Sequence, residues 1–324
     1  HAHFPGAYNI ALFTDEERKV VGTAYKQQGR EFAIKLGLDY FGVKMRKMVE
    51  DVEALVHNHH GAIILVHCWR GGMRSEAVAW LLDLYGFKVF TLIGGYKRFR
   101  KYVLESFDYP VRLRILAGFT GSGKTHLLHE LHRQQQTIID LEAIANHRGS
   151  AFGNIGLSAQ PSQEMFENIL ALRLRNKMTD LIGLEDEGQR FGLVIIPLKL
   201  WEQMQRSPAY FFDIPFEVRL LQTEKEYGTL EKEKLADAIR RIQKRLGGLE
   251  TKKALQNLQD GNLSESFRVL LTYYDKCYLK SWDNRYKIQP GRNIITSGLA
   301  DEKANATLLM RILHNESDIA FKQS

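Results

Sequence analysis

Short apolar runs alternate with amphipathic segments over most of this chain. Apolar runs of strand length, bounded by polar, glycine or proline residues, lie at residues 62–67, 88–93, 112–117, 137–140, 180–184 and 209–213. Apolar positions recur at helical spacing over residues 75–85, 96–107 and 162–178, and residues 214–282 are mostly helical in pattern. The alternation of strands and helices predicts an α/β fold built on parallel sheets.

The segment Asp108-Tyr109-Pro110 interrupts this alternation, because proline does not continue a helix. The chain has 324 residues, which is enough for roughly two domains of about 150 residues each. We therefore predict an N-terminal domain over residues 1–110 and a second domain over residues 111–324, whose C-terminal part is helical.

The composition narrows the class of protein. Cys68 and Cys277 are the only cysteines, which excludes a disulfide framework or a zinc ribbon and fits the reducing cytoplasm. No apolar run approaches the roughly 20 residues of a membrane span, so we expect a soluble cytoplasmic protein with no membrane partner. The first residue is histidine rather than methionine, and we expect further residues upstream of it.

Residues 118–125 read Gly-Phe-Thr-Gly-Ser-Gly-Lys-Thr and directly follow a predicted strand. This is the G-x-x-x-x-G-K-[ST] pattern, in which backbone N–H groups and a helix N-terminus surround a phosphate. Lys124 adds a point charge, and Thr125 is placed to ligate Mg²⁺. The predicted phosphate- or diphosphate-binding residues are Gly118, Thr120, Gly121, Ser122, Gly123, Lys124 and Thr125.

An acidic partner for Mg²⁺ is expected at the end of a neighbouring strand. Asp140 ends one predicted strand, and the run Glu185-Asp186-Glu187 follows another. Thr125, Asp140 and Asp186 are the candidate metal ligands, although the sequence does not choose among the acids. A nucleoside triphosphate and an organic diphosphate present the same oxygens to such a loop. We expect Mg²⁺ to accompany the phosphate ligand and no cofactor to be bound tightly.

Residues 67–75 read His-Cys-Trp-Arg-Gly-Gly-Met-Arg-Ser and lie between a predicted strand and a predicted helix. A helix N-terminus and neighbouring arginines lower the pKa of a thiol, so we predict that Cys68 is a thiolate. Cys277 has no such surroundings, and we interpret it as structural. The candidate catalytic residues are Cys68, Arg70 and Arg74. The candidate anion-binding loop consists of Gly71, Gly72, Met73 and Ser75.

Two classes of enzyme use a cysteine loop of this kind. Cysteine phosphatases hold a phosphate with the pattern C-x₅-R, a spacing that Cys68 and Arg74 match. Rhodanese-type sulfurtransferases carry sulfur or selenium on the cysteine. Two further segments, residues 1–10 and the turn Gly94-Gly95-Tyr96, resemble rhodanese sequences. The rhodanese interpretation is therefore the stronger one for this half of the chain.

A rhodanese half followed directly by a phosphate-loop half resembles the tRNA 2-selenouridine synthase family. Local sequences at residues 22–29, 140–150 and 184–188 agree with this family in order and spacing. The resemblance covers residues 1 to about 230, and beyond them only the helical character matches. It also places the first strand of the rhodanese sheet upstream of His1.

This resemblance implies that selenium replaces the sulfur of the wobble 2-thiouridine in tRNA by way of an S-geranyl intermediate. Geranyl diphosphate and selenophosphate would be the co-substrates, and an enzyme that supplies selenophosphate is a candidate partner. Cys68 would serve the selenium step. The loop at residues 118–125 would hold the diphosphate, so that Lys124 and Mg²⁺ take up charge on the leaving oxygens.

The net charge of +7 is localised. Residues 94–114 and residues 231–253 each carry a net charge of +4, so the rest of the chain is slightly acidic. Basic stretches of this kind suit an RNA backbone, here that of the anticodon loop of tRNA. The candidate tRNA-binding residues are Lys97, Arg98, Arg100, Lys101, Arg240, Arg241, Lys244 and Arg245.

Two other functions stay open at the level of sequence. The first is a cysteine phosphatase that uses the loop from Cys68 to Arg74. The second is a phosphate-loop kinase of a small molecule, in which the rhodanese-like half is a non-catalytic appendage.

Overall fold

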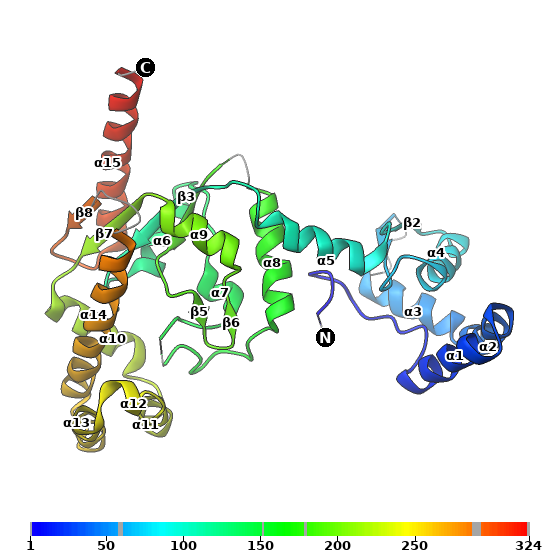
Figure 1. Cartoon of the computed structure of the whole chain (residues 1–324), viewed down its shortest axis with the longest axis horizontal. Helices are drawn as coiled ribbons and strands as arrows, with labels where there is room; N and C mark the ends of the chain where they lie inside the picture. Colours follow the sequence, from blue (N-terminus) through cyan, green and yellow to red (C-terminus); the bar gives the residue numbers. More distant parts are fainter. Residues whose placement is uncertain (1, 58–60, 151, 178–179, 287–292, 323–324) are drawn as a thin grey trace. The chain divides into compact units, whose positions relative to one another are not determined.

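The computed structural model describes residues 2–57, 61–150, 152–177, 180–286 and 293–322 (Figure 1). Residues 3–103 form one compact unit, and the residues from Leu104 onward form another. We call them the cysteine unit and the phosphate-loop unit. Each is a mixture of helices and parallel strands.

The cysteine unit is built around a pair of parallel strands. β1 (Ile63–Val66) pairs with β2 (Lys88–Thr91). The helices of the cysteine unit are α1 (Asp15–Gln27), α2 (Arg30–Gly42), α3 (Met45–Leu55), α4 (Met73–Tyr85) and most of α5 (Gly95–Ser106). Ile64, Val66 and Val89 pack against a core formed with α3 and α4. Ile63 and Leu65 alternate with them and are exposed, as expected for strands that bury one face.

The phosphate-loop unit contains a four-stranded parallel sheet with the order β4-β3-β7-β8. The strands are β3 (Arg112–Ala117), β4 (Leu181–Glu185), β7 (Ala209–Asp213) and β8 (Asn293–Thr296). α6 (Lys124–Arg133) and α15 (Glu302–Lys322) cover one face through residues such as Leu128 and Leu309. On the other face, Trp282 of α14 (Leu263–Tyr286) packs on Phe211 with ring centroids 5.0 Å apart. Helices on both faces explain why most positions of the central strands β3 and β7 are apolar.

The prediction of a strand over residues 137–140 is wrong in its length. Only Ile138 forms a bridge, to Gly183 of β4, and the chain then turns into the short helix α7 (Leu141–Ala145). The turn follows from Asp140, whose carboxylate accepts the backbone N–H of Ala143 and caps this helix. The sequence pattern also did not indicate β8 or the small hairpin of β5 (Arg190–Phe191) and β6 (Val194–Ile195).

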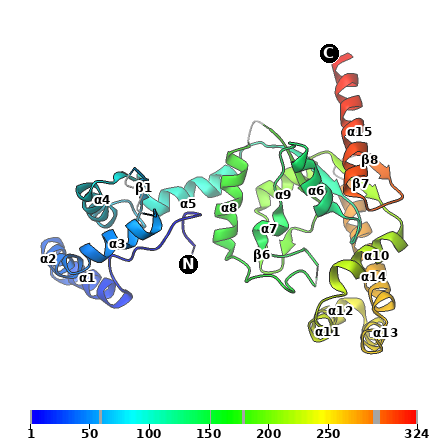
Figure 2. The same ribbon diagram turned by 180° about the vertical axis from the view of Figure 1, so that it is seen from behind.

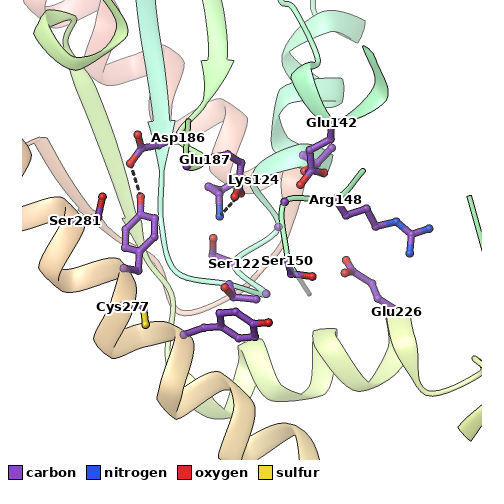
Figure 3. Close-up of a pocket in the computed structure, with 18 of the residues that line it drawn as sticks. Ser122, Lys124, Glu142, Arg148, Ser150, Asp186, Glu187, Glu226, Cys277 and Ser281 are labelled. Atoms are coloured by element: carbon purple, nitrogen blue, oxygen red, sulfur yellow. Dashed lines mark hydrogen bonds and ion pairs between the residues drawn. The ribbon is translucent and has the colours of Figure 1, made fainter. Parts of the chain in front are cut away.

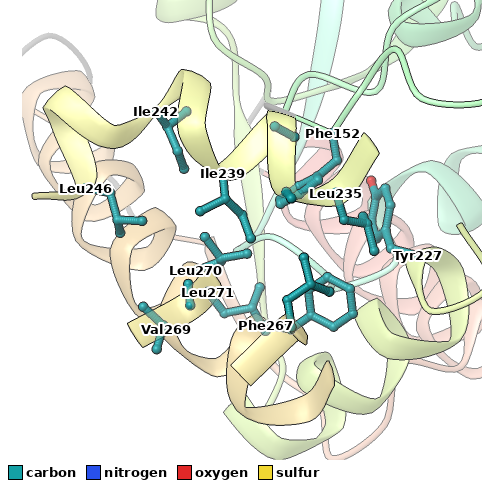
Figure 4. Close-up of a cluster of buried hydrophobic side chains, with 14 of the residues drawn as sticks. Phe152, Tyr227, Leu235, Ile239, Ile242, Leu246, Phe267, Val269, Leu270 and Leu271 are labelled. Atoms are coloured by element: carbon teal, nitrogen blue, oxygen red, sulfur yellow. The ribbon is translucent and has the colours of Figure 1, made fainter. Parts of the chain in front are cut away.

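The remaining helices are α8 (Gln163–Arg175), α9 (Leu198–Arg206), α10 (Phe216–Tyr227), α11 (Lys232–Arg241), α12 (Gln243–Leu246) and α13 (Gly248–Gln259). Figure 2 shows α11, α12 and α13 gathered beside α10 and α14. Their core joins Phe152, Tyr227, Leu235, Ile239 and Phe267, which come from separate segments of the chain (Figure 4). The helical region is therefore packed onto the segment around residue 152 and belongs to the same unit as the sheet.

Within the residues that the structure describes, no helix is both long enough and apolar enough to cross a lipid bilayer.

Candidate functional site

Cys68 lies in the loop between β1 and α4, which we call the cysteine loop (residues 67–75). The Ser75 hydroxyl lies 3.3 Å from the Cys68 Sγ and 2.9 Å from the carbonyl oxygen of Gly72. Burial raises the pKa of the thiol, but hydrogen bonds from Ser75 and from the backbone of Gly72 and Arg70 lower it more, to about 7. The pKa therefore lies near neutral pH, where the thiolate, the reactive form of cysteine, is well populated.

The turn after β2 holds the cysteine loop in place. Gly95 has a φ of +60°, and a Cβ atom on it would lie 2.4 Å from the carbonyl oxygen of Cys68. The neighbouring Tyr96 N–H donates to that same oxygen over 2.9 Å. Gly71 has a φ of +65°, and a Cβ atom there would lie 2.6 Å from the Gly95 nitrogen. Two backbones thus approach so closely that only glycine fits at either position.

Three of the predicted residues of the cysteine loop, Arg70, Gly72 and Ser75, contact the thiol through their backbone N–H groups. The side chains of Arg70, Met73 and Arg74 are exposed, and Arg30 Nη2 lies 3.8 Å from the Met73 Sδ. Ser75, in contrast, is buried at the start of α4. The thiol is therefore activated by backbone N–H groups and one hydroxyl, with the arginines at the surface of the unit.

The phosphate loop (residues 118–125) connects β3 to α6 and has the expected fold. Gly121 and Gly123 both have a φ of +77°, and α6 begins at Lys124. The Lys124 Nζ donates to the carbonyl oxygen of Gly118 over 2.9 Å and lies 3.5 Å from Glu187 Oε1. The ammonium group therefore lies within the loop, where it faces any phosphate that the loop holds.

The acidic run Glu185-Asp186-Glu187, which begins at the last residue of β4, makes three different contacts. Glu185 is fully buried, and its Oε1 accepts the backbone N–H groups of the first two residues of α7 over 3.0 and 3.1 Å. Asp186 accepts the hydroxyl of Tyr278 over 2.7 Å. Glu187 pairs with Lys124. Burial raises the pKa of Glu187, and the charge of Lys124 opposes that rise.

The hydroxyl of Thr125 donates to Glu142 Oε2 over 3.1 Å. Burial and the charge of Glu187 both raise the pKa of Glu142, so a cation at this place would relieve the repulsion between the two carboxylates. Asp140, a predicted metal ligand, instead lies 2.6 Å from the Nε2 of His129 and caps α7. Among the described residues, no three His, Cys, Asp or Glu side chains converge as a complete ligand set.

The phosphate loop opens into a cavity of about 520 Å³, which we call the phosphate-loop cavity (Figure 3). Its acidic lining consists of Glu142 of α7, Asp186 and Glu187 after β4, and Glu226 of α10, and Arg148 adds a positive charge. Tyr274, Cys277, Tyr278 and Ser281 of α14 form a further wall, together with Trp201 of α9 and Arg245 of α12. Cys277, which the sequence suggested to be structural, is therefore exposed at this cavity.

Two side chains that the sequence did not indicate fix the shape of the phosphate loop. The hydroxyl of Tyr278 accepts a hydrogen bond from the Gly118 N–H over 3.2 Å and donates a hydrogen bond to Asp186. Arg219 is 3% exposed, donates to the carbonyl oxygen of Thr120 over 3.1 Å, and forms two hydrogen bonds with Asp275. No local motif marks either residue, because both reach the loop from about 100 or more residues away.

The predicted tRNA-binding residues fall in two places. Lys97, Arg98 and Lys101 are exposed on α5, where Arg100 is half-buried. Arg240, Arg241, Lys244 and Arg245 are exposed on α11 and α12. Only the second group belongs to the same unit as the phosphate-loop cavity, and Arg245 lines that cavity.

The parallel sheet, with a phosphate loop between β3 and α6, defines a phosphate-loop α/β domain. Residues 111–303 match the family profile described as tRNA 2-selenouridine synthase AAA domain. The chain belongs to the tRNA 2-selenouridine synthase family.

Relatives of that name resemble the chain over most of its length. The protein from Nitrosomonas europaea is 32% identical, over 87% of this chain and 86% of that protein. The protein from Pseudomonas putida strain F1 is 35% identical, over 85% of this chain and 82% of that protein. The protein from Hydrogenovibrio crunogenus is 36% identical, over 85% of this chain and 84% of that protein. The similarity therefore extends through both units.

Proposed function

We propose that this protein is a tRNA-modifying transferase that converts the wobble 2-thiouridine into 2-selenouridine by way of an S-geranyl intermediate. Membership of the tRNA 2-selenouridine synthase family supports the overall reaction. One observation carries the division into two steps: the chain has an activated thiol in one unit and a phosphate loop in the other. The cysteine unit would then be the rhodanese domain that its sequence resembles.

The first step takes place at the phosphate loop in this proposal. The sulfur of 2-thiouridine attacks C1 of geranyl diphosphate, the C1–O bond breaks, and the electron pair leaves with the diphosphate while the uridine loses its N3 proton. Lys124 and the N–H groups of the loop stabilise the charge that develops on the leaving oxygens. The Ser122 hydroxyl is buried without a hydrogen-bond partner among the described residues, which leaves it available to the diphosphate.

Oxygen atoms around the phosphate loop suit a hard divalent cation such as Mg²⁺. Thr125 and Glu142 are in contact, and Glu187 lies close enough to raise the pKa of Glu142. These three side chains, rather than Asp140, would hold Mg²⁺ beside the diphosphate, with Asp186 at the edge of the same cavity. The metal would supply additional positive charge against the leaving group.

The second step takes place at the cysteine loop in this proposal. The Cys68 thiolate attacks C2 of the uridine, the C2–S bond breaks, and geranyl thiol leaves with a proton. The selenium of selenophosphate then displaces Cys68 from C2, and water cleaves the Se–P bond so that phosphate leaves and 2-selenouridine remains. Selenium is already fully reduced in selenophosphate, so this exchange needs no external oxidant. Cys68 supplies the thiolate of this step, and its pKa of about 7 keeps a large share of it reactive at neutral pH. An enzyme that makes selenophosphate would be the natural supplier.

Mass spectrometry of nucleosides tests the proposal. Wild-type protein incubated with 2-thiouridine tRNA, geranyl diphosphate and selenophosphate should produce 2-selenouridine. Cys68→Ser should stop at S-geranyl-2-thiouridine, and Lys124→Ala should leave 2-thiouridine largely unchanged. Lys35→Ala on α2, exposed and outside both the cavity and the two basic stretches, is the matched lysine control and should behave as wild type.

Other outcomes would contradict the proposal and favour a rival function. Full selenation by Cys68→Ser together with phosphoryl transfer from ATP would favour a phosphate-loop kinase with a non-catalytic appendage. Hydrolysis of a phenyl phosphate that disappears in Cys68→Ser, with no change in the tRNA, would favour a cysteine phosphatase.

A further inference from the structure

One face of α14 forms a wall of the phosphate-loop cavity that lies outside the phosphate loop itself. Tyr274, Cys277, Tyr278 and Ser281 follow the spacing i, i+3, i+4 and i+7 of one helical face, and all of them line the cavity. Figure 3 shows Cys277 and Ser281 on one side of the loop and Arg148 and Glu226 on the other. The cavity is therefore larger than a phosphate requires, and its α14 wall presents aromatic rings and small polar groups.

A line of basic side chains leads to this wall. Arg245 of α12 lines the cavity. Burial and the neighbouring Cys277 raise the pKa of Tyr273 on α14, and Arg245 lies close enough for its charge to oppose that rise. Lys244 is exposed next to it. Arg241 Nη2 lies 3.5 Å from Asn154 Oδ1, so α11 also reaches the segment that follows α7. The basic surface of α11 and α12 thus ends at the cavity.

We propose that the α14 wall binds one unstacked nucleotide of the RNA substrate. The RNA backbone follows Arg241, Lys244 and Arg245, and the base enters the cavity against the ring of Tyr274. Aromatic rings beside guanidinium groups are the usual means by which proteins hold a splayed-out base and its phosphates. The cavity of about 520 Å³ lies within the usual size range of ligand sites.

This inference rests on the proposed function and adds a location to it. If geranyl diphosphate is held at Lys124, the sulfur of the wobble nucleotide must reach C1 of the geranyl group inside the same cavity. The α14 wall faces the phosphate loop from within the same compact unit. The wobble nucleotide therefore has to enter along a wall of this cavity, and the α14 wall is the one that the basic helices reach.

Cys277 provides a reporter for this site, because it is exposed in the middle of the α14 wall. The rate of its alkylation in the wild-type protein can be followed by peptide mass spectrometry, which separates it from Cys68. A saturating anticodon stem-loop that contains 2-thiouridine should slow the alkylation of Cys277 about tenfold. The same stem-loop with an abasic wobble position should bind but protect much less. Binding of the thiolated stem-loop with no change at Cys277 would overturn the proposal.

A second measurement places the RNA backbone. Arg245→Ala should weaken stem-loop binding about tenfold and reduce the slope of log K against log salt by about one. The control is Lys35→Ala on α2, which removes an exposed charge outside the cavity and outside both basic stretches and should change neither quantity. Equal effects of the two variants would contradict a backbone path along Arg245.

Geranyl diphosphate, tested separately, distinguishes this inference from the proposed function. If the stem-loop protects Cys277 but the protein does not bind geranyl diphosphate, the assignment of the phosphate loop to geranyl diphosphate is contradicted, whereas the nucleotide site is supported. Binding of geranyl diphosphate that requires Lys124, without protection by the stem-loop, would keep the first step and overturn the nucleotide site.

Discussion

The hydroxyl of Ser75 should control the reactivity of Cys68. Its hydrogen bond to the Sγ is the largest of the contributions that lower the pKa of the thiol, and Ser75→Ala removes it with almost no change in volume. A hydrogen bond to a charged group contributes about 1.5–3 kcal/mol, equivalent to about one or two pKa units. Because the thiol is partly exposed, solvent screening favours the lower end of that range. We therefore expect the pKa to rise from about 7 to about 8.

The rate of alkylation by iodoacetamide, measured at Cys68 as a function of pH, checks this shift. The thiolate is present above the pKa, so the midpoint of the rate profile should move to higher pH in Ser75→Ala. At neutral pH the thiolate fraction should fall from about one half to about one tenth. Cys277 provides an internal reference in each sample, and Ser266→Ala removes a different buried hydroxyl. A midpoint that stays near 7 in Ser75→Ala would refute the reasoning.

Two further predictions concern the supports of the two loops. Arg219→Ala leaves Asp275 without its partner, and the free energy of unfolding measured in urea should fall by about 3–5 kcal/mol. The exposed ion pair between Arg268 and Glu217 provides the control. An equal loss of unfolding free energy in Arg268→Ala would contradict the idea that burial makes the Arg219 pair more important than an exposed one. Gly95→Ala introduces a Cβ atom 2.4 Å from the carbonyl oxygen of Cys68, so the turn must move and the alkylation of Cys68 should slow. A wild-type alkylation profile in Gly95→Ala would show that the turn does not hold the loop.

The central strands of the phosphate-loop unit could be predicted from the sequence. β3 and β7 were expected over residues 112–117 and 209–213, and the structure has both at those bounds. Most of their positions are apolar, because helices cover the two faces of the sheet; the exceptions are Arg112 and Arg114 in β3 and Asp213 at the end of β7. Gly118 follows β3 at the phosphate loop. Strong local patterns of this kind leave little choice of structure.

The surroundings of the phosphate loop depend on contacts that no local pattern records. Strand-end positions suggested Asp140 and Asp186 as metal ligands beside Thr125, and the structure adds Glu142, whose carboxylate contacts Thr125. Glu142 reaches it because Asp140 turns the chain into α7 instead of continuing a strand. Tyr278 likewise reaches the loop from α14, 160 residues along the chain from Gly118. Such contacts arise only when the helical region packs onto the sheet.

The central claim is that the two loops serve successive steps, and a bypass measurement tests it most directly. tRNA that already carries S-geranyl-2-thiouridine is supplied with selenophosphate to Lys124→Ala and to Cys68→Ser, and the nucleosides are quantified by mass spectrometry. The two-step account predicts that Lys124→Ala, inactive on 2-thiouridine tRNA, forms 2-selenouridine from this substrate at nearly the wild-type rate, whereas Cys68→Ser forms none. Selenation by Cys68→Ser, or failure of a folded Lys124→Ala on the geranylated tRNA, would contradict the account.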